Sequence, residues 1–201
     1  MKNRIAVTLL VVGVLTGCAT LGPSLGTKYA YTYRMTKPDH LGTLRWSDSN
    51  IDIAFEVRDT DLGFILQNRS PESMKVIWDE AVIVQYGEAK KIMHGGVKFI
   101  DRFNSQPPTI LPSGTSMTDQ VLPSENVYYR KGTYSTYVSS PGGWEEKDLF
   151  PTHDLNRAEY KEAILGNKGQ TIGLYLPVDI GGNVIKYEFE FEVADVEAVT
   201  K

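Results

Sequence analysis

The sequence predicts an all-β fold, an antiparallel β-sandwich with one short helix near residues 156–165. Hydrophobic and polar residues alternate along several short segments, and clusters of Gly, Pro, Asn, Asp and Ser separate these segments. Alternation with a period of two is typical of strands that have one buried face. Only one segment combines a helix cap signal with helical apolar spacing. Many short strands separated by turn signals favour a sandwich.

The first predicted strands lie between residues 51 and 84. Apolar residues occupy the odd positions of 51–57, and 64–67 is a second mainly apolar segment. A third alternating segment, 74–79, includes Trp78. Residues 81–84 form a short continuous apolar run, which is typical of a central strand.

One more strand and the helix are predicted in the next part of the chain. Two Leu-Pro-Ser sequences bracket residues 115–121 as turns bracket a strand. Asn156 and Glu159 have the spacing of a capping box, with Asn at the cap position. A short apolar stripe follows, and Gly166 is expected to end the helix.

The clearest hairpin lies near the end of the chain. Residues 172–180 and 187–193 each place apolar side chains at alternate positions, and Gly181-Gly182-Asn183 lies between them. Glycines at this point are typical of a tight hairpin turn. Pro177 has no amide hydrogen to donate, so we expect its strand to lie at a sheet edge or to carry a bulge there.

The composition is that of an ordinary globular protein. Of 201 residues, 41% are hydrophobic and 23% are charged, which excludes a disordered or collagen-like chain. The 21 Lys and Arg against 25 Asp and Glu give a net charge of −4, without a strongly basic stretch. Nucleic-acid binding needs clustered Lys and Arg to neutralise phosphates, so the sequence predicts no nucleic-acid partner.

The first 17 residues have the features of a secretory signal peptide. Lys2 and Arg4 give a positively charged start, and the apolar run over 5–15 is about half as long as a membrane span. A short apolar run between a basic start and small residues predicts a signal peptide over 1–17 that is cleaved on export.

The sequence that ends this segment, Leu15-Thr16-Gly17-Cys18, resembles the lipobox of bacterial lipoproteins, and Cys18 is the only cysteine in the chain. The resemblance implies cleavage before Cys18, transfer of a diacylglycerol to its thiol, and acylation of the new amine. Lipoproteins kept at the inner membrane often carry Asp at the next position, where this chain has Ala19. The resemblance therefore implies an outer-membrane anchor facing the periplasm. The alternatives are a simple signal peptide cut elsewhere, and a buried cysteine in an uncleaved helix.

The mature chain is expected to form one domain on a short lipid-anchored tether. Residues 18–28 are mostly small, include Gly and Pro, and carry no charge before Lys28. Residues 29–201 show no shift in composition that would mark a second domain, and their number suits a single core. Removal of residues 1–17 leaves 19 basic and 25 acidic residues, a net charge of −6.

The predicted body resembles immunoglobulin-like sandwiches, whose core tryptophan lies on an early strand, as Trp78 is expected to do. The disulfide of antibody domains is absent, because the chain has one cysteine. The body is also similar to small exported lipoproteins of unknown function that carry such a sandwich. Neither resemblance implies an activity.

The sequence shows no motif for catalysis, metal binding or cofactor binding. His40, His94 and His153 are far apart in the chain and lack the spacing of a zinc site. The residues Glu188, Glu190 and Glu192 share one strand face, where they could meet a basic partner or a cation but are typical of a solvated face. We therefore predict no catalytic residue, no metal and no cofactor.

The segment 126–150 is rich in aromatic residues among Ser, Thr, Lys and Gly. Tyr and Trp combine a large contact area with a polar group, so they are enriched at binding surfaces. Arg130-Lys131-Gly132 is expected to turn a hairpin here. The alternative is a hairpin folded over one end of the sandwich, with rings that close the core. Neighbours on a strand point to opposite faces, so at least one of Tyr128 and Tyr129 is expected to be buried. The predicted binding residues are Tyr128, Tyr129, Tyr134, Tyr137 and Trp144.

Together these features predict a non-enzymatic lipoprotein, held at the membrane by the lipid on Cys18, that binds or scaffolds an envelope protein or glycan. Two alternatives are an enzyme acting on cell-wall or lipid sugars, and a structural subunit of an envelope assembly. Two carboxylates about 5–9 Å apart in a cleft would favour the enzyme. An exposed, unpaired, apolar strand edge would favour the subunit.

Overall fold

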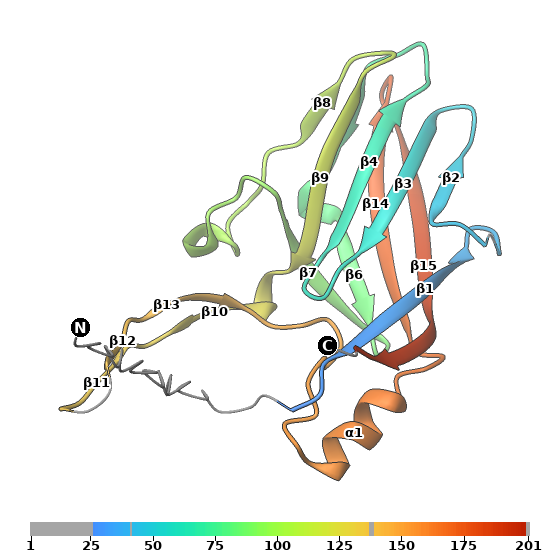
Figure 1. The fold of residues 1–201 in the computed structure, drawn as a ribbon. Coiled ribbons are helices and arrows are strands. Elements are labelled where there is room, and N and C mark those ends of the chain that lie inside the picture. Colours follow the sequence, from blue (N-terminus) through green and yellow to red (C-terminus); the bar gives the residue numbers. More distant parts are fainter. Residues whose placement is uncertain (1–25, 41, 137–138, 200–201) are drawn as a thin grey trace, which may run out of the picture.

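The computed structural model describes residues 26–40, 42–136 and 139–199. They form an antiparallel all-β body with one short α-helix, so the predicted fold class is confirmed (Figure 1). The elements are β1 (Tyr29–Lys37), β2 (Arg45–Ser47), β3 (Ile51–Val57), β4 (Leu62–Asn68), β5 (Met74–Val76), η1 (Trp78–Glu80), β6 (Val82–Gln85), β7 (Glu88–His94), η2 (Phe99–Asp101), β8 (Thr109–Leu111), β9 (Ser116–Pro123), η3 (Ser124–Asn126), β10 (Val127–Arg130), β11 (Thr133–Tyr134), β12 (Ser139–Ser140), β13 (Gly143–Glu146), α1 (Ala158–Leu165), β14 (Thr171–Ile180) and β15 (Asn183–Ala198).

One sheet of eleven strands forms both layers of the sandwich. Its main path runs β1-β15-β14-β6-β7-β9-β4-β3-β2, and β5 and β8 continue it beside the second half of β14. The sheet curls until β3 and β4 face β14 and β15, which gives a sandwich-like half-barrel (Figure 1). The two layers are therefore halves of one continuous sheet.

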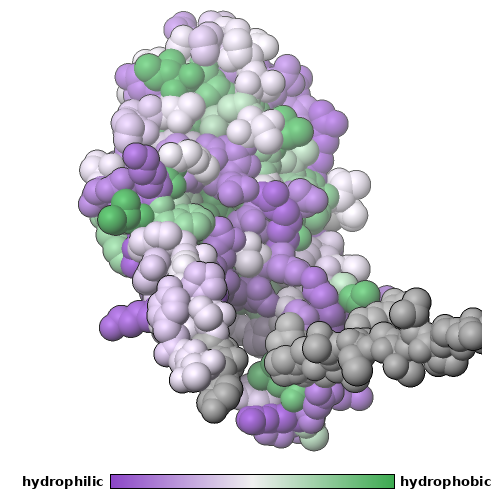
Figure 2. Space-filling view, turned by 60° about the vertical axis from the view of Figure 1, so that its left-hand side comes forward, coloured by the Kyte–Doolittle hydropathy of each residue, from purple (hydrophilic) through white to green (hydrophobic). Residues whose placement is uncertain are grey.

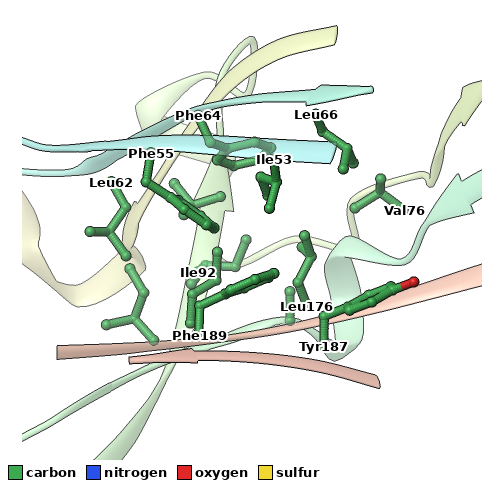
Figure 3. Packing of buried hydrophobic residues seen from close by; sticks show 14 of the residues in the cluster. Ile53, Phe55, Leu62, Phe64, Leu66, Val76, Ile92, Leu176, Tyr187 and Phe189 are labelled. Atoms are coloured by element: carbon green, nitrogen blue, oxygen red, sulfur yellow. The ribbon is translucent and has the colours of Figure 1, made fainter. Parts of the chain in front are cut away.

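Aromatic rings from the two layers meet in the core. The ring centroid of Phe55 on β3 lies 4.8 Å from that of Phe189 and 4.9 Å from that of Phe191, both on β15. Figure 3 shows Phe55 and Phe189 pointing toward each other between the layers. Near the open edge, the Trp46 ring of β2 lies 5.8 Å from the Tyr187 ring. These contacts hold the curled sheet closed, because burial of each large ring removes its apolar surface from water.

The predicted hairpin between β14 and β15 is confirmed. Ile180 pairs with Asn183 across the turn. Gly181 has φ +57° and Gly182 has φ +89°, as a two-residue turn with both central residues in the left-handed region requires. The apolar positions of both strands that were expected to face inward are buried.

The expectation for Pro177 is wrong in detail, because β14 is a central strand. On one side β14 pairs with β15 along its whole length. On the other side it pairs with β6 through Tyr175 and with β5 from Val178 onward. Pro177 lies where one neighbour ends and the next begins, and its carbonyl oxygen accepts a hydrogen bond from the Ile77 amide at 3.0 Å. Pro177, which has no amide hydrogen, therefore lies at a position of β14 where neither β5 nor β6 pairs with it.

Trp78 is fully buried as expected, but it begins η1 instead of lying on a strand. Its ring stacks on the imidazole of His94, with centroids 4.4 Å apart and planes within 9°. The indole N–H donates to the Thr109 hydroxyl at 2.8 Å. The buried polar atom of this large side chain is thereby satisfied.

Helix α1 forms close to the predicted place, but the predicted capping box does not. Asn156 has φ +58°, and Arg157 takes the N-cap position without a side-chain cap hydrogen bond. The amide of Asn156 instead donates to Asp154 Oδ1 at 3.0 Å. The chain therefore bends sharply just before the helix.

The same carboxylate fastens the start of the described chain to the body. The Thr27 amide donates to Asp154 Oδ1 at 2.8 Å, and the Asp154 amide donates to the Thr27 carbonyl at 3.2 Å. A Cβ on Gly26, which has φ +80°, would lie 2.1 Å from Asp154 Oδ1, so only glycine fits. Residues 26–28 of the predicted tether are thus held against the body, and eight residues, 18–25, precede them in the predicted mature chain.

Asp154→Asn is expected to weaken folding at neutral pH and to remove part of its acid sensitivity. Backbone hydrogen bonds from Asn156 and then Thr27 hold the pKa of Asp154 below its ordinary 3.8. A lowered folded-state pKa adds stability above the unfolded pKa and loses it as the pH falls through the folded one. Urea unfolding of the wild type and of Asp154→Asn should therefore give free energies of unfolding that become equal as the pH is lowered. A difference that is constant with pH would contradict this role.

Candidate functional site

The predicted binding segment forms an arm that projects from the body (Figure 1). We define the aromatic arm as Val127–Thr136 and Ser139–Glu146. Near the body β10 pairs with β13, and farther out β11 pairs with β12. In the view of Figure 2 the arm is a pale projection below the body. Cys18 and Tyr137 lie outside the described residues.

The base of the arm is anchored in a small second core. Val127 is buried with Met93 and Leu122, and Val97 and Phe99 pack against them. Burial at this point fixes where the arm leaves the body.

The aromatic side chains of the arm are exposed. Tyr128, Tyr129, Tyr134 and Trp144 keep 45%, 55%, 76% and 38% of their accessible surface. The alternative in which these rings close the core is therefore wrong, and so is the expectation that one of the first two tyrosines is buried. The arm extends away from the sandwich, so water reaches both of its faces.

The turn of the hairpin also differs from the prediction. The chain passes through Gly132 and reverses only between Tyr134 and Ser139. Gly132 lies against Gly142, where a Cβ on either residue would lie 2.8 Å from the backbone nitrogen of the other. The two glycines allow the strands to approach closely between the inner and outer ladders, a role that a sequence pattern for turns does not reveal.

One face of the arm carries an aromatic cluster, which we call the aromatic face: Phe99, Arg102, Phe103, Tyr129 and Trp144. Tyr129 pairs with Trp144 across the strands, and their ring centroids are 5.5 Å apart, edge to face. The Trp144 ring lies 6.1 Å from that of Phe99. The Arg102 guanidinium lies 4.6 Å from the Phe103 ring centre and 5.0 Å from that of Trp144. Cation–π contacts of this kind hold the guanidinium between the two rings.

Arg102 has hydrogen-bonding capacity to spare. One terminal nitrogen donates to the Phe99 carbonyl oxygen at 2.9 Å. Within the described residues, Arg102 Nε is one of two buried side-chain polar atoms without a hydrogen-bond partner. This Nε is buried, so it lies out of reach of a partner, and leaving it unpaired costs free energy.

The opposite face of the arm is polar. The Tyr128 hydroxyl donates to Glu145 Oε2 at 3.0 Å, and Arg130 pairs with the same carboxylate. The hydrogen bond from Arg130, followed by that from Tyr128, lowers the pKa of Glu145. Hydrogen bonding to Glu145 raises the pKa of Tyr128 above its ordinary 10. Both hydrogen bonds favour the protonated phenol and the charged carboxylate.

Sequence reasoning missed the residues in and just after η2 that complete the aromatic face. Phe99, Arg102 and Phe103 lie in a short irregular segment without strand alternation. Two aromatic residues flanking an arginine within five positions gave the only available signal. Their contact with Trp144 depends on how the arm leaves the body, which no local pattern predicts.

Several titratable groups elsewhere in the described chain make structural contacts. His94 Nδ1 lies 3.0 Å from Asp119 Oδ2, beside Trp78. Glu190 pairs with Lys37 at 3.2 Å, and Glu192 pairs with Arg34 at 2.8 Å. Within the residues described, no three His, Cys, Asp or Glu side chains gather as metal ligands would.

Comparisons with known proteins give no relative from which a function could be carried over. The chain matches no protein-family model, and no curated protein or solved structure resembles it significantly. In the part of the chain that the structure describes, no helix is both long and apolar enough to span a bilayer. A function for this chain must therefore be inferred from the site itself.

Proposed function

We propose that this protein is a non-enzymatic, exported lipoprotein anchored through Cys18, more specifically to the outer membrane facing the periplasm. It binds an envelope protein or glycan through its aromatic face. The observation that carries this proposal is the exposed cluster of Tyr129, Trp144 and Phe103 around Arg102. Tyr, Trp and Arg dominate the energetics of binding surfaces.

Because the protein is anchored to the membrane, a weak contact with its partner is sufficient for binding. A partner in the same envelope layer is confined near the aromatic face, so its effective concentration is high. The β10–β13 ladder and the Val127 base fix the rings before contact, which reduces the entropy that binding would cost.

Replacing Tyr129 and Trp144 together by Ala is expected to abolish capture of the partner. Both side chains are substantially exposed, so the free energy of unfolding should fall by no more than about 1 kcal/mol. The measurement is crosslinking in intact envelopes, followed by identification of the adducts and by urea unfolding. Ile110→Ala, at an exposed position on β8, is the matched control and should leave the adducts unchanged. Equal adducts in all three proteins would refute the proposed site.

A structural subunit is a second candidate, because a specific strand edge favours it. β15 pairs with β14 from Asn183, but β1 joins its other side only from Glu190 onward. In the described chain, the stretch between them therefore has one edge without a strand partner. Val184 on this stretch is 49% exposed. An extended segment of another protein could add there through backbone hydrogen bonds.

A further inference from the structure

The point where the tether meets the body limits how far the body can lie from the membrane. This step depends on the lipid anchor of the proposed function. Cys18 and Gly26 are eight residues apart, a distance that an extended chain spans with at most about 28 Å. Gly26 and Thr27 are held at Asp154, just before α1. Figure 1 shows this segment, coloured blue, at the same end of the molecule as α1 and the base of the arm.

Large exposed side chains gather at this end. Tyr86, Tyr128, Leu155 and Tyr160 line one cleft of about 560 Å³, although they come from three separate parts of the chain. Each of the four is between 39% and 54% exposed. They are joined there by Leu165 of α1, which is 43% exposed.

The outer part of the arm adds an aromatic and basic segment. Tyr134 is 76% exposed, the highest value among the large hydrophobic and aromatic side chains of the described chain. It follows Val127 by seven residues, so it can lie up to about 23 Å from the arm's base. Between Tyr129 and Trp144 the sequence has Arg130, Lys131 and no acidic residue, although Glu145 of the next strand pairs with Arg130.

From these observations we infer that the end of the body formed by Tyr128, Tyr134, Tyr160 and Leu165 lies on the lipid headgroups of the membrane that holds the anchor. Tyrosine is favoured at this interface, because its ring meets acyl chains while its hydroxyl stays hydrated. Lys131 matches anionic lipid phosphates in charge, whereas Arg130 is paired with Glu145. Tyr128 and Tyr129 point to opposite faces of β10. Contact on the Tyr128 side therefore leaves the aromatic face free for the partner.

The test places a fluorescent reporter at each end of the lipidated full-length protein. Tyr134→Trp and Tyr160→Trp report on the inferred contact, and Ile110→Trp reports on an exposed site on β8, away from it. Each variant is reconstituted in vesicles of phosphatidylethanolamine and phosphatidylglycerol, with and without bromine on the acyl chains. The tryptophan emission added over the wild type is expected to be quenched by bromine at positions 134 and 160 and unchanged at 110. Unfolding midpoints equal to the wild type confirm that the variants fold.

Three other outcomes overturn the inference in distinguishable ways. Vesicle flotation without quenching at positions 134 and 160 leaves the anchor in place and shows that this end faces water. Shielding of these reporters from acrylamide only after envelope proteins are added identifies a protein as the occupant. Failure of the protein to float with the vesicles refutes the lipid anchor and with it the proposed function.

Discussion

Cys18→Ser is expected to abolish incorporation of a fatty-acid label and to remove the protein's anchor in the membrane. The chain has one cysteine, so no other thiol can accept the diacylglycerol. Burial of each lipid CH₂ contributes about 0.8 kcal/mol, and two or more chains give stable anchoring where one gives only marginal binding.

The experiment follows an alkyne-tagged fatty acid through growth and then separates membranes from soluble protein. Ser24→Ala changes another small polar side chain before Gly26, and this control should retain both label and membrane association. Undiminished label in Cys18→Ser would show that the lipid is attached elsewhere or that the labelled species is not this protein.

Phe189→Ala is expected to lower the free energy of unfolding by about 3–5 kcal/mol, the usual cost of deleting a buried phenyl ring. The Phe189 side chain is 2% exposed. It touches Phe55 of the facing layer and lies 5.9 Å from Trp46 at the open edge of the sheet. Its loss leaves a cavity between the layers where no strand pairing holds the half-barrel closed. A small domain has only about 5–15 kcal/mol of total stability, so this loss is a large share.

Urea denaturation measures this effect directly. Val184→Ala removes two methyl groups from an exposed position on the same strand, and its effect should stay within about 0.5 kcal/mol. If Phe189→Ala and Val184→Ala lowered the free energy of unfolding by similarly small amounts, the ring contacts between β3 and β15 would not stabilise the packing of the two layers.

The β-strands with strict alternation could be predicted because one local pattern sets both their conformation and their buried face. The β14–β15 hairpin illustrates this, since Gly181 and Gly182 also supply the turn. The position of Pro177 could not be predicted in this way. Its tolerance in a central strand depends on β5 and β6 pairing with different halves of β14, which is a long-range property.

The candidate site shows the same division. The aromatic-rich segment could be identified from composition, but the exposure of its rings could not, because a hairpin folded over the core also fits the sequence. The arrangement of the aromatic side chains could not be predicted from the sequence. It depends on the packing of Val127 beside Met93 and on the contact of η2 with Trp144. The helix cap failed for a related reason: Asp154 binds the amides of both Asn156 and Thr27, so the local capping pattern loses to a contact with a distant part of the chain.

Mass spectrometry of the amino-terminal peptide of the native protein shows directly whether Cys18 carries the lipid anchor. We expect a peptide that begins at Cys18, carries a thioether-linked diacylglycerol and is acylated on its amine. A peptide with an unmodified Cys18 thiol, or one that still includes residues before it, would contradict the lipid anchor and the membrane contact inferred from it.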